Sequence, residues 1–283
     1  MSPKKITYFF DLIRFDNPIG FMLLMWPCWF ALAYIPLNQV GLIHWYIYFT
    51  IGAFLMRSAG CIINDLVDIN LDKNIERTAL RPLTSNKISI LEAVLLLFVL
   101  LFLSLIILIQ FQINTILIGL ISIPLVIFYP YMKRYTNWPQ LCLGVVFNWG
   151  VLIVSIEFFN EINLHFFLLY FACIFWTLAY DTIYAYQDRE DDLKNNIKST
   201  AVLFGSLGHK FVMTFYAIFF LIIGFLGYKS SGNLLSFATI FLYIFVMILH
   251  FNKWRLNSKT SSNYYFKFNN IIGLSCFIFL LIF

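Results

Sequence analysis

N-D-L-V-D-I-N-L-D-K-N-I-E-R-T-A-L-R, residues 64–81, follows directly after a long apolar segment at residues 45–63. Asp65, Asp68 and Asp72 are separated by three and four residues, so they share one face if the helix continues. Three carboxylates near the C-terminus of a helix repel one another, and the helix dipole also disfavours them there. A divalent cation would relieve this repulsion. Ligands that are all oxygen favour Mg2+ or a similar hard ion.

A second acidic stretch repeats this arrangement. Residues 181–192 read D-T-I-Y-A-Y-Q-D-R-E-D-D and end the apolar segment at residues 164–186. Asp188 and Asp192 have the spacing of the last two aspartates of the first motif and follow them by 120 residues. One acidic cluster is most often a solvated helix end, but two clusters of equal spacing, each closing a membrane-length helix, favour a pair of metal-binding motifs. Further positions of the second motif are Asp181, Tyr184 and Asp191.

The composition is that of an integral membrane protein. Of the 283 residues 61% are hydrophobic and only 12% are charged, whereas soluble domains have about half apolar and about a quarter charged residues. A window of about 19 residues predicts an all-α polytopic fold with about nine transmembrane helices. The expected spans are residues 19–35, 45–63, 90–109, 113–129, 141–159, 164–186, 211–228, 234–251 and 266–283.

The basic residues predict the orientation in the membrane. All but two of the 19 lysines and arginines fall on one side of the expected spans; Lys229 falls on the other side and Arg57 lies within a span. Cytoplasmic loops carry the excess of basic residues. We therefore expect the N-terminus and both acidic motifs to be cytoplasmic.

The spacing of the motifs also predicts the domain organisation. The spans that carry them, the second and the sixth, are four helices apart and end on the same side, which fits two tandem four-helix repeats plus one helix. We expect residues 1–283 to form a single transmembrane domain, with repeat halves at about 10–130 and 131–252 and an extra helix at about 264–283. The longest connections are the motif loops, residues 65–89 and 188–209.

Two acidic clusters and a surplus of basic residues at one membrane face fit a diphosphate. Mg2+ between carboxylates can hold a diphosphate, and lysine or arginine can neutralise the remaining phosphate oxygens. A diphosphate beside an interior with 33 Phe and 16 Tyr indicates a lipid tail such as a polyprenyl group. Aromatic faces and carboxylates can stabilise the allylic cation that forms when diphosphate departs. The basic candidates are Arg77, Arg81, Lys133, Arg134, Lys194 and Lys198.

Arg57 lies seven residues before Asn64, on the face of the first motif. An arginine inside a membrane span is costly, so its default interpretation is functional. We expect it to hold an anionic acceptor, with Arg14 as a second candidate; the alternative is a structural ion pair with an aspartate. Asn64 is expected to orient a substrate oxygen or to complete a metal shell.

These motifs resemble a known family. N-D-x-x-D-x-x-x-D-x-x-x-x-R from residue 64, with T-A-x-R-P-L at residues 78–83, is similar to the first motif of the UbiA family of intramembrane aromatic prenyltransferases. Y-D-T-x-Y-A-x-x-D-R-x-D-D at residues 180–192, followed by K-S-T, is similar to the second. R-x-D-x-P-I-G and Y-P-x-M-K-R-Y-T, from residues 14 and 129, further resemble the branch that prenylates 4-hydroxybenzoate for ubiquinone synthesis.

The resemblance implies Mg2+-dependent transfer of a polyprenyl group from a polyprenyl diphosphate to the ring carbon ortho to the phenol of 4-hydroxybenzoate, with release of diphosphate. It also implies nine spans, a lateral opening for the prenyl tail and a place in the bacterial inner membrane. Asn196 departs from the family pattern, which often has glycine there. In this chain the implied catalytic and metal-binding positions are Asp68, Asp72, Asp188 and Asp192, with Arg134 on the phosphates, Arg57 and Asn64 near the acceptor, and Asn64 and Asp65 as further candidate metal ligands.

Two alternatives remain at this point. A sister enzyme of the same fold would use a naphthoate, homogentisate or haem as acceptor. An intramembrane cation transporter would use the carboxylates as an ion path, but such a path should carry polar groups through the bilayer midplane, and here the acidic residues cluster at one interface. The expected partners are the two substrates and the lipid bilayer; the sequence indicates no nucleic acid and no obligate protein partner.

Overall fold

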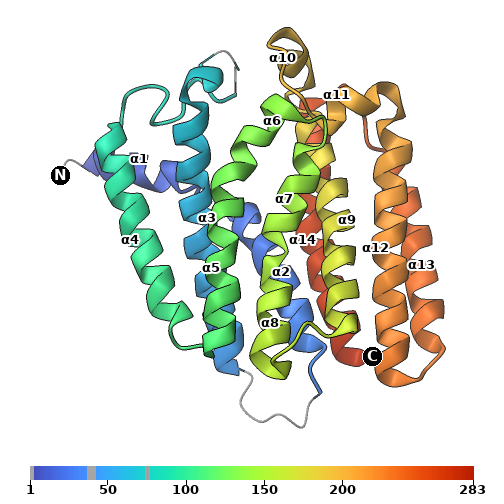
Figure 1. The fold of residues 1–283 in the computed structure, drawn as a ribbon. Coiled ribbons are helices and arrows are strands. Elements are labelled where there is room, and N and C mark those ends of the chain that lie inside the picture. The colour runs from blue at the N-terminus through green and yellow to red at the C-terminus, as the bar shows by residue number, and fades with distance from the viewer. Residues whose placement is uncertain (1–2, 37–42, 74, 76) are drawn as a thin grey trace.

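The computed structural model describes residues 3–36, 43–73, 75 and 77–283, and every regular element among them is a helix. The long helices stand side by side as a bundle, and α1 lies across them near one end (Figure 1). The elements in chain order are α1 (Pro3–Leu12), α2 (Ile19–Ala33), α3 (Ile43–Asp72), α4 (Ile90–Leu108), α5 (Ile113–Phe128), η1 (Tyr129–Tyr131), α6 (Met132–Tyr135), α7 (Pro139–Phe147), α8 (Trp149–Phe159), α9 (Leu164–Ala185), α10 (Arg189–Lys194), α11 (Thr200–Phe204), η2 (Gly205–Leu207), α12 (Gly208–Ser231), α13 (Leu235–Phe251) and α14 (Lys259–Ile282).

The expected all-α polytopic fold is confirmed. In the described part of the chain, seven helical segments are long and apolar enough to cross a membrane. Two further apolar helices, α2 with 15 residues and α13 with 17, are shorter than the ~20 residues that a span usually needs. The helices follow the expected segments in order, whereas the number of nine full-length spans is not confirmed. The sequence analysis did not foresee α1.

α3 corrects the expected boundary of the first motif. Residues 65–89 were expected to form a loop, but α3 continues without a break through Asp72, so the aspartates lie on a helix. Beyond the helix end, the Thr78 hydroxyl donates a hydrogen bond to the Asp72 carbonyl oxygen at 2.9 Å. This bond satisfies one of the carbonyl groups that a helix leaves unpaired at its C-terminus. The second expected loop, residues 188–209, contains α10, α11 and η2.

The span expected at residues 141–159 is divided into α7 and α8 at Asn148. The Asn148 side-chain amide donates to the Gly144 carbonyl oxygen at 2.7 Å and to the Thr177 hydroxyl at 2.9 Å. Because the amide competes with the backbone ladder, it supports a break in the helix and joins α7 to α9.

The core of the bundle is built around α9, whose span is the most buried of the seven. Trp176 on α9 and Tyr216 on α12 are fully buried, and each donates a hydrogen bond of 2.8 Å to the Asn269 side-chain oxygen of α14. The Asn269 amide donates to the Tyr265 carbonyl oxygen at 3.0 Å. Buried polar groups that are paired in this way fix the relative positions of three helices.

α4 and α5 belong to the two least buried of the seven membrane-length segments. Only 11% of the α4 span and 17% of the segment from Ile113 to Tyr135 are buried. Phe98 and Phe102 on α4 and Ile121 on α5 are among the exposed apolar side chains. A surface of this composition is suited to contact with lipid.

Candidate active site

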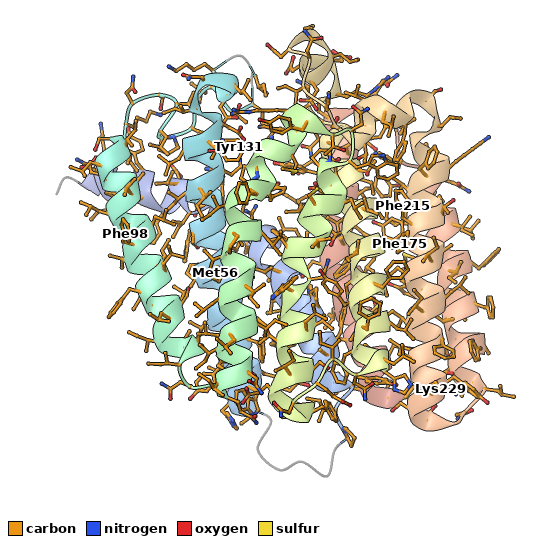
Figure 2. All side chains as sticks on the ribbon, viewed as in Figure 1. Met56, Phe98, Tyr131, Phe175, Phe215 and Lys229 are labelled. Atoms are coloured by element: carbon orange, nitrogen blue, oxygen red, sulfur yellow. The ribbon has the colours of Figure 1, made fainter. Side chains whose placement is uncertain are left out.

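A cavity of about 1120 Å3 extends from the two acidic motifs to the apolar residues of α4 and α5. Its walls come from α2, α3, α4, α5, α7, α8, α9 and α14 and from the segments that follow α3 and α9. Met56 on α3 and Phe98 on α4, both labelled in Figure 2, line this cavity. The apolar wall consists of Phe98, Leu101, Phe102, Leu105 and Leu108 from α4 and Leu120, Ile123 and Val126 from α5.

At the mouth of the cavity the first motif is neutralised by two arginines. Arg14 Nη2 lies 2.7 Å from both carboxylate oxygens of Asp65. Arg81 Nη1 lies 3.0 Å from Asp65 Oδ1 and 2.7 Å from Asp72 Oδ2. Arg14 has a positive φ of 59°, a left-handed conformation that ends α1 and turns the chain towards α2. The structure therefore brings together four expected site residues, Arg14, Asp65, Asp72 and Arg81.

Asp68 lies behind this mouth and not on the cavity wall. Its carboxylate is fully buried, and Oδ2 accepts a hydrogen bond of 2.5 Å from Lys133 Nζ. The other oxygen, Oδ1, lies 3.7 Å from Arg134 Nη2 and has no hydrogen-bond partner among the described residues. Arg134 donates to the Val67 carbonyl oxygen at 2.9 Å and lies outside the cavity.

One ion pair joins the two motifs. Arg77, which follows α3, donates to Asp188 through Nε at 3.0 Å and through Nη2 at 2.6 Å. Its guanidinium also stacks over the ring of Tyr184, 5.1 Å from the centroid. A bidentate arginine–carboxylate pair fixes geometry as well as charge. The two motifs, 111 residues apart at this contact, thus meet across the cavity mouth.

The rest of the second motif divides between the cavity wall and the surface. Asp192 lines the cavity, and burial, reinforced by the negative charge of Asp188, raises the pKa of Asp192 to about 7. Lys198 also lines the cavity and donates to the Tyr135 carbonyl oxygen at 3.0 Å. Asp191 and Lys194 pair with each other at 3.9 Å outside it.

The oxygen donors of the two acidic motifs fit a hard cation. Carboxylate and amide oxygens are the ligands that Mg2+ prefers, and the buried Asp68 Oδ1 is left without a hydrogen bond. Across the described ranges, however, no three His, Cys, Asp or Glu side chains lie close enough together to hold a metal ion by themselves. Most of the carboxylates are instead paired with arginine or lysine, so their negative charge is balanced by side chains of the protein.

The inner part of the cavity holds Arg57. Its Nε is buried and has no hydrogen-bond partner among the described residues, and its guanidinium lies 5.5 Å from the centroid of the Phe147 ring. Gly20 of α2 makes room for it, because a Cβ at position 20 would lie 2.7 Å from Arg57 Nε. An unpaired buried guanidinium is costly unless a ligand anion pairs with it.

Asn64, Asp181 and Tyr184 line the same cavity. Within the described ranges, neither the Asn64 side chain nor the Asp181 carboxylate has a hydrogen bond or an ion pair within 4.0 Å. Asp181 interacts electrostatically with Arg57, but it does not form the structural ion pair that the sequence analysis left open. The inner cavity thus contains one positively charged side chain, Arg57, one acidic side chain, Asp181, and two neutral polar side chains, Asn64 and Tyr184.

Two polar residues of the site were not predicted from the sequence. Asn263 and Lys267 of α14 line the cavity beside Phe266. Their spacing of four residues places them on one helical face. A pair of polar residues on one face of an otherwise apolar helix could have indicated that this face lines a site. Lys267 was counted only among the basic residues of the cytoplasmic side.

Asn196 has a φ of 54°, in the left-handed region that glycine and asparagine tolerate best. The departure from glycine at this position is therefore compatible with the turn before Lys198.

The fold and the cavity define a polytopic helical membrane protein with a charged mouth and an apolar side wall, as expected for an enzyme that binds an amphipathic substrate. Residues 24–271 match the model of the UbiA prenyltransferase family. The chain belongs to this family and is an integral membrane prenyltransferase, which argues against the transporter alternative.

Curated relatives match the chain over nearly its whole length. A 4-hydroxybenzoate octaprenyltransferase of Pseudoalteromonas translucida is 35% identical over 281 residues, which cover 99% of this chain and 96% of the relative. A 4-hydroxybenzoate octaprenyltransferase of Francisella tularensis subsp. novicida is 36% identical over 280 residues, 98% of each chain.

Solved structures have the same fold. A UbiA homologue from Aeropyrum pernix K1 has a TM-score of 0.73 at 21% identity and covers 92% of this chain and 96% of its own. A UbiA homologue from Archaeoglobus fulgidus, bound to GPP and Mg2+, has a TM-score of 0.71 at 19% identity, with 98% and 100% covered.

Proposed function

We propose that the protein transfers a polyprenyl group from an allylic polyprenyl diphosphate to the ring of 4-hydroxybenzoate, ortho to the hydroxyl, and releases diphosphate, as a step of ubiquinone biosynthesis. The observation that carries this proposal is one cavity that joins paired charges at its mouth, an unpaired arginine inside and an apolar wall at its side. The names of the full-length relatives support the same acceptor.

The mouth provides the groups that a diphosphate needs. Arg77, Arg81 and Lys133 lie in ion pairs from which they can turn to phosphate oxygens. Lys198, which also lines the cavity, is assigned to the same role, and Arg134 and Lys194, which lie outside the cavity, would add positive charge near it. Mg2+ would be held by Asp68, Asp72, Asp188 and Asp192, with Asn64 and Asp65 as further oxygen donors, and when bound there it supplies positive charge that stabilises the departing diphosphate.

The apolar wall suits the prenyl tail. The side chains of α4 and α5 line the cavity on one side and face outward on the other, so a hydrocarbon chain can leave the cavity between or along them without crossing water. Burial of each methylene group stabilises binding by about 0.8 kcal/mol. The rings of Tyr129, Tyr184 and Phe147 lie in the cavity wall, where their π-faces can stabilise positive charge on the allylic carbon.

The inner cavity suits the acceptor. We assign Arg57 to the carboxylate of 4-hydroxybenzoate, since a charged hydrogen bond would satisfy the buried Nε that has no partner among the described residues. Asn64 is placed to orient the ring by hydrogen bonding, and Arg14, engaged with Asp65, supports the mouth from the side. The acceptor would then lie between Arg57 and the diphosphate, with its ring towards the allylic carbon.

The distribution of basic residues supports an orientation with the N-terminus and both motifs in the cytoplasm of a bacterial cell, in its inner membrane. α3 and α9 both reach the motif end of the bundle, where α6, α10 and α11 also lie (Figure 1). Cysteines introduced singly into the α10 segment and into the α8–α9 connection should differ in their labelling by a membrane-impermeant thiol reagent.

The proposal is tested with membranes that contain the protein, labelled polyprenyl diphosphate, Mg2+ and 4-hydroxybenzoate, with parallel reactions that offer a naphthoate or homogentisate. We expect a prenylated hydroxybenzoate that disappears when a chelator is added. Transfer only to another acceptor would refute the acceptor assignment and indicate a sister enzyme. No transfer to any acceptor by folded protein would refute the proposed activity.

A further inference from the structure

The inner cavity contains a carboxylate that the proposed function has not used. Asp181 lies on α9, about one turn before the end of this helix at Ala185. It lines the cavity together with Arg57, Asn64 and Tyr184. The mouth carboxylates Asp65 and Asp188 each touch an arginine, whereas Asp181 has no hydrogen bond and no ion pair within 4.0 Å in the described part of the chain.

Asp181 nevertheless has charged and polar neighbours. It interacts with the Arg57 guanidinium and with the hydroxyl groups of Tyr129 and Tyr180. Because Asp181 has no direct partner among the described residues, its carboxylate oxygens are available to a ligand in the cavity. A carboxylate in this state can accept a proton from a bound molecule.

Prenylation of an aromatic ring requires such an acceptor of protons. The ring carbon forms a bond to the first carbon of the prenyl group, and the allylic C–O bond breaks with its electron pair going to diphosphate. The attacked ring carbon then carries both the prenyl group and its original hydrogen. That hydrogen must leave as a proton, and its bonding electrons restore the aromatic ring.

We propose that Asp181 is the catalytic base that takes this proton from the acceptor ring, an inference that rests on the proposed function. With the acceptor carboxylate on Arg57, the ring lies in the part of the cavity that Asp181 lines. The mouth carboxylates Asp65, Asp72 and Asp188 are engaged by cations, and Asp192 lies beside Asp188 among the diphosphate-binding groups. Asp181 is thus the carboxylate placed at the acceptor and not at the leaving group.

A positioning role through Arg57 is the competing explanation, and the two roles give different kinetics. Loss of a base slows proton removal but leaves acceptor binding, whereas loss of a partner for Arg57 weakens acceptor binding. A general base contributes about 100-fold or more to the rate. The isotope effect of a ring-deuterated acceptor separates the two explanations, because it reports only on the step that breaks the C–H bond.

The test uses the full chain in membranes with 4-hydroxybenzoate carrying hydrogen or deuterium at both positions ortho to the hydroxyl. We expect Asp181→Asn to lower kcat by about 100-fold, to change the acceptor KM little and to introduce a primary deuterium isotope effect larger than that of the unmodified protein. Asp181→Glu should recover part of the rate and lower the isotope effect again. Glu161→Gln, an exposed carboxylate between α8 and α9, is the matched control and should behave as the unmodified protein.

Three results would overturn the inference: Asp181→Asn with a kcat within about threefold of normal, a loss confined to the acceptor KM, or a loss of kcat without any increase in the isotope effect. If Asp181→Asn does not fold, Asp181→Ala, which also lacks the carboxylate, is measured in its place against Asp181→Glu. Failure of the unmodified protein to prenylate 4-hydroxybenzoate would instead refute the proposed function, and the same isotope experiment on whichever acceptor it uses would still decide the role of Asp181.

Discussion

The contact between Gly20 and Arg57 predicts a specific defect in acceptor binding. In Gly20→Ala the added Cβ would lie 2.7 Å from Arg57 Nε, and ordinary contact begins at 3.4 Å. The guanidinium must therefore retreat by about 0.7 Å, the difference between these two distances. A hydrogen bond to a charged group contributes ~1.5–3 kcal/mol, which corresponds to roughly 10–150-fold in affinity. This is the largest loss of acceptor affinity that we expect, and Arg57→Ala, which removes the guanidinium, should approach it.

Since displacement of a positioning group by about 1 Å can cost up to ~100-fold, we expect Gly20→Ala to raise the acceptor KM by roughly tenfold. The KM of the prenyl diphosphate should stay unchanged, because the three atoms nearest to a Cβ at position 20 all belong to Arg57. Steady-state kinetics with one substrate varied at a time measures both constants. Gly52→Ala also adds a methyl group to the cavity wall but meets no atom of the described residues within 4 Å, so it serves as the matched control.

An acceptor KM for Gly20→Ala within about twofold of the control would contradict the role of Arg57 as the carboxylate-binding group. An equal rise in both KM values would show that the added methyl group disturbs the cavity as a whole and would refute the same reasoning.

Three further predictions concern the motif aspartates, the divalent ion and the core of the bundle. Asp68→Ala and Asp188→Ala should each abolish turnover while the protein remains folded in the membrane, and near-normal activity of either variant would exclude it from the metal-binding set. Removal of divalent ions by a chelator should stop product formation and added Mg2+ should restore it; activity that persists in the chelator would contradict a metal requirement. Asn269→Leu removes the acceptor of two buried hydrogen bonds, so it should cost ~1–3 kcal/mol of stability and lower the midpoint of thermal unfolding in detergent, and an unchanged midpoint would show that these bonds contribute little.

Much of the fold could be predicted from the sequence, because apolar runs of membrane length determine where helices can lie. The ends of the helices were less predictable. The polar stretch after residue 63 was expected to be a loop, yet it continues α3 through Asp72. In the folded chain two arginines and one lysine neutralise its carboxylates. Asn148 lies within an apolar run, and the break there depends in part on its hydrogen bond to Thr177 of another helix, which the sequence pattern does not encode.

The candidate site was predictable in its acidic residues but not in its ion pairs. The repeated spacing marks Asp188 and Asp192 without any knowledge of the fold, whereas the pairing of Arg77 with Asp188 joins residues 111 positions apart. Lys194 was chosen by its charge and Arg134 by its charge and by the family resemblance, and both lie outside the cavity. These assignments depend on distances in space that a pattern along the chain does not encode.

The pairing of charges at the mouth has a thermodynamic consequence. Asp65, Asp72 and Asp188 already balance Arg14, Arg81 and Arg77, so a bare diphosphate arriving there would meet little net positive charge. Its affinity must then increase with the concentration of divalent ion, and by reciprocity the affinity for the ion must increase by the same factor when the diphosphate is present. The two solutes are thus linked ligands of one site, and calorimetric titration of either one alone should report weaker binding than titration in the presence of the other.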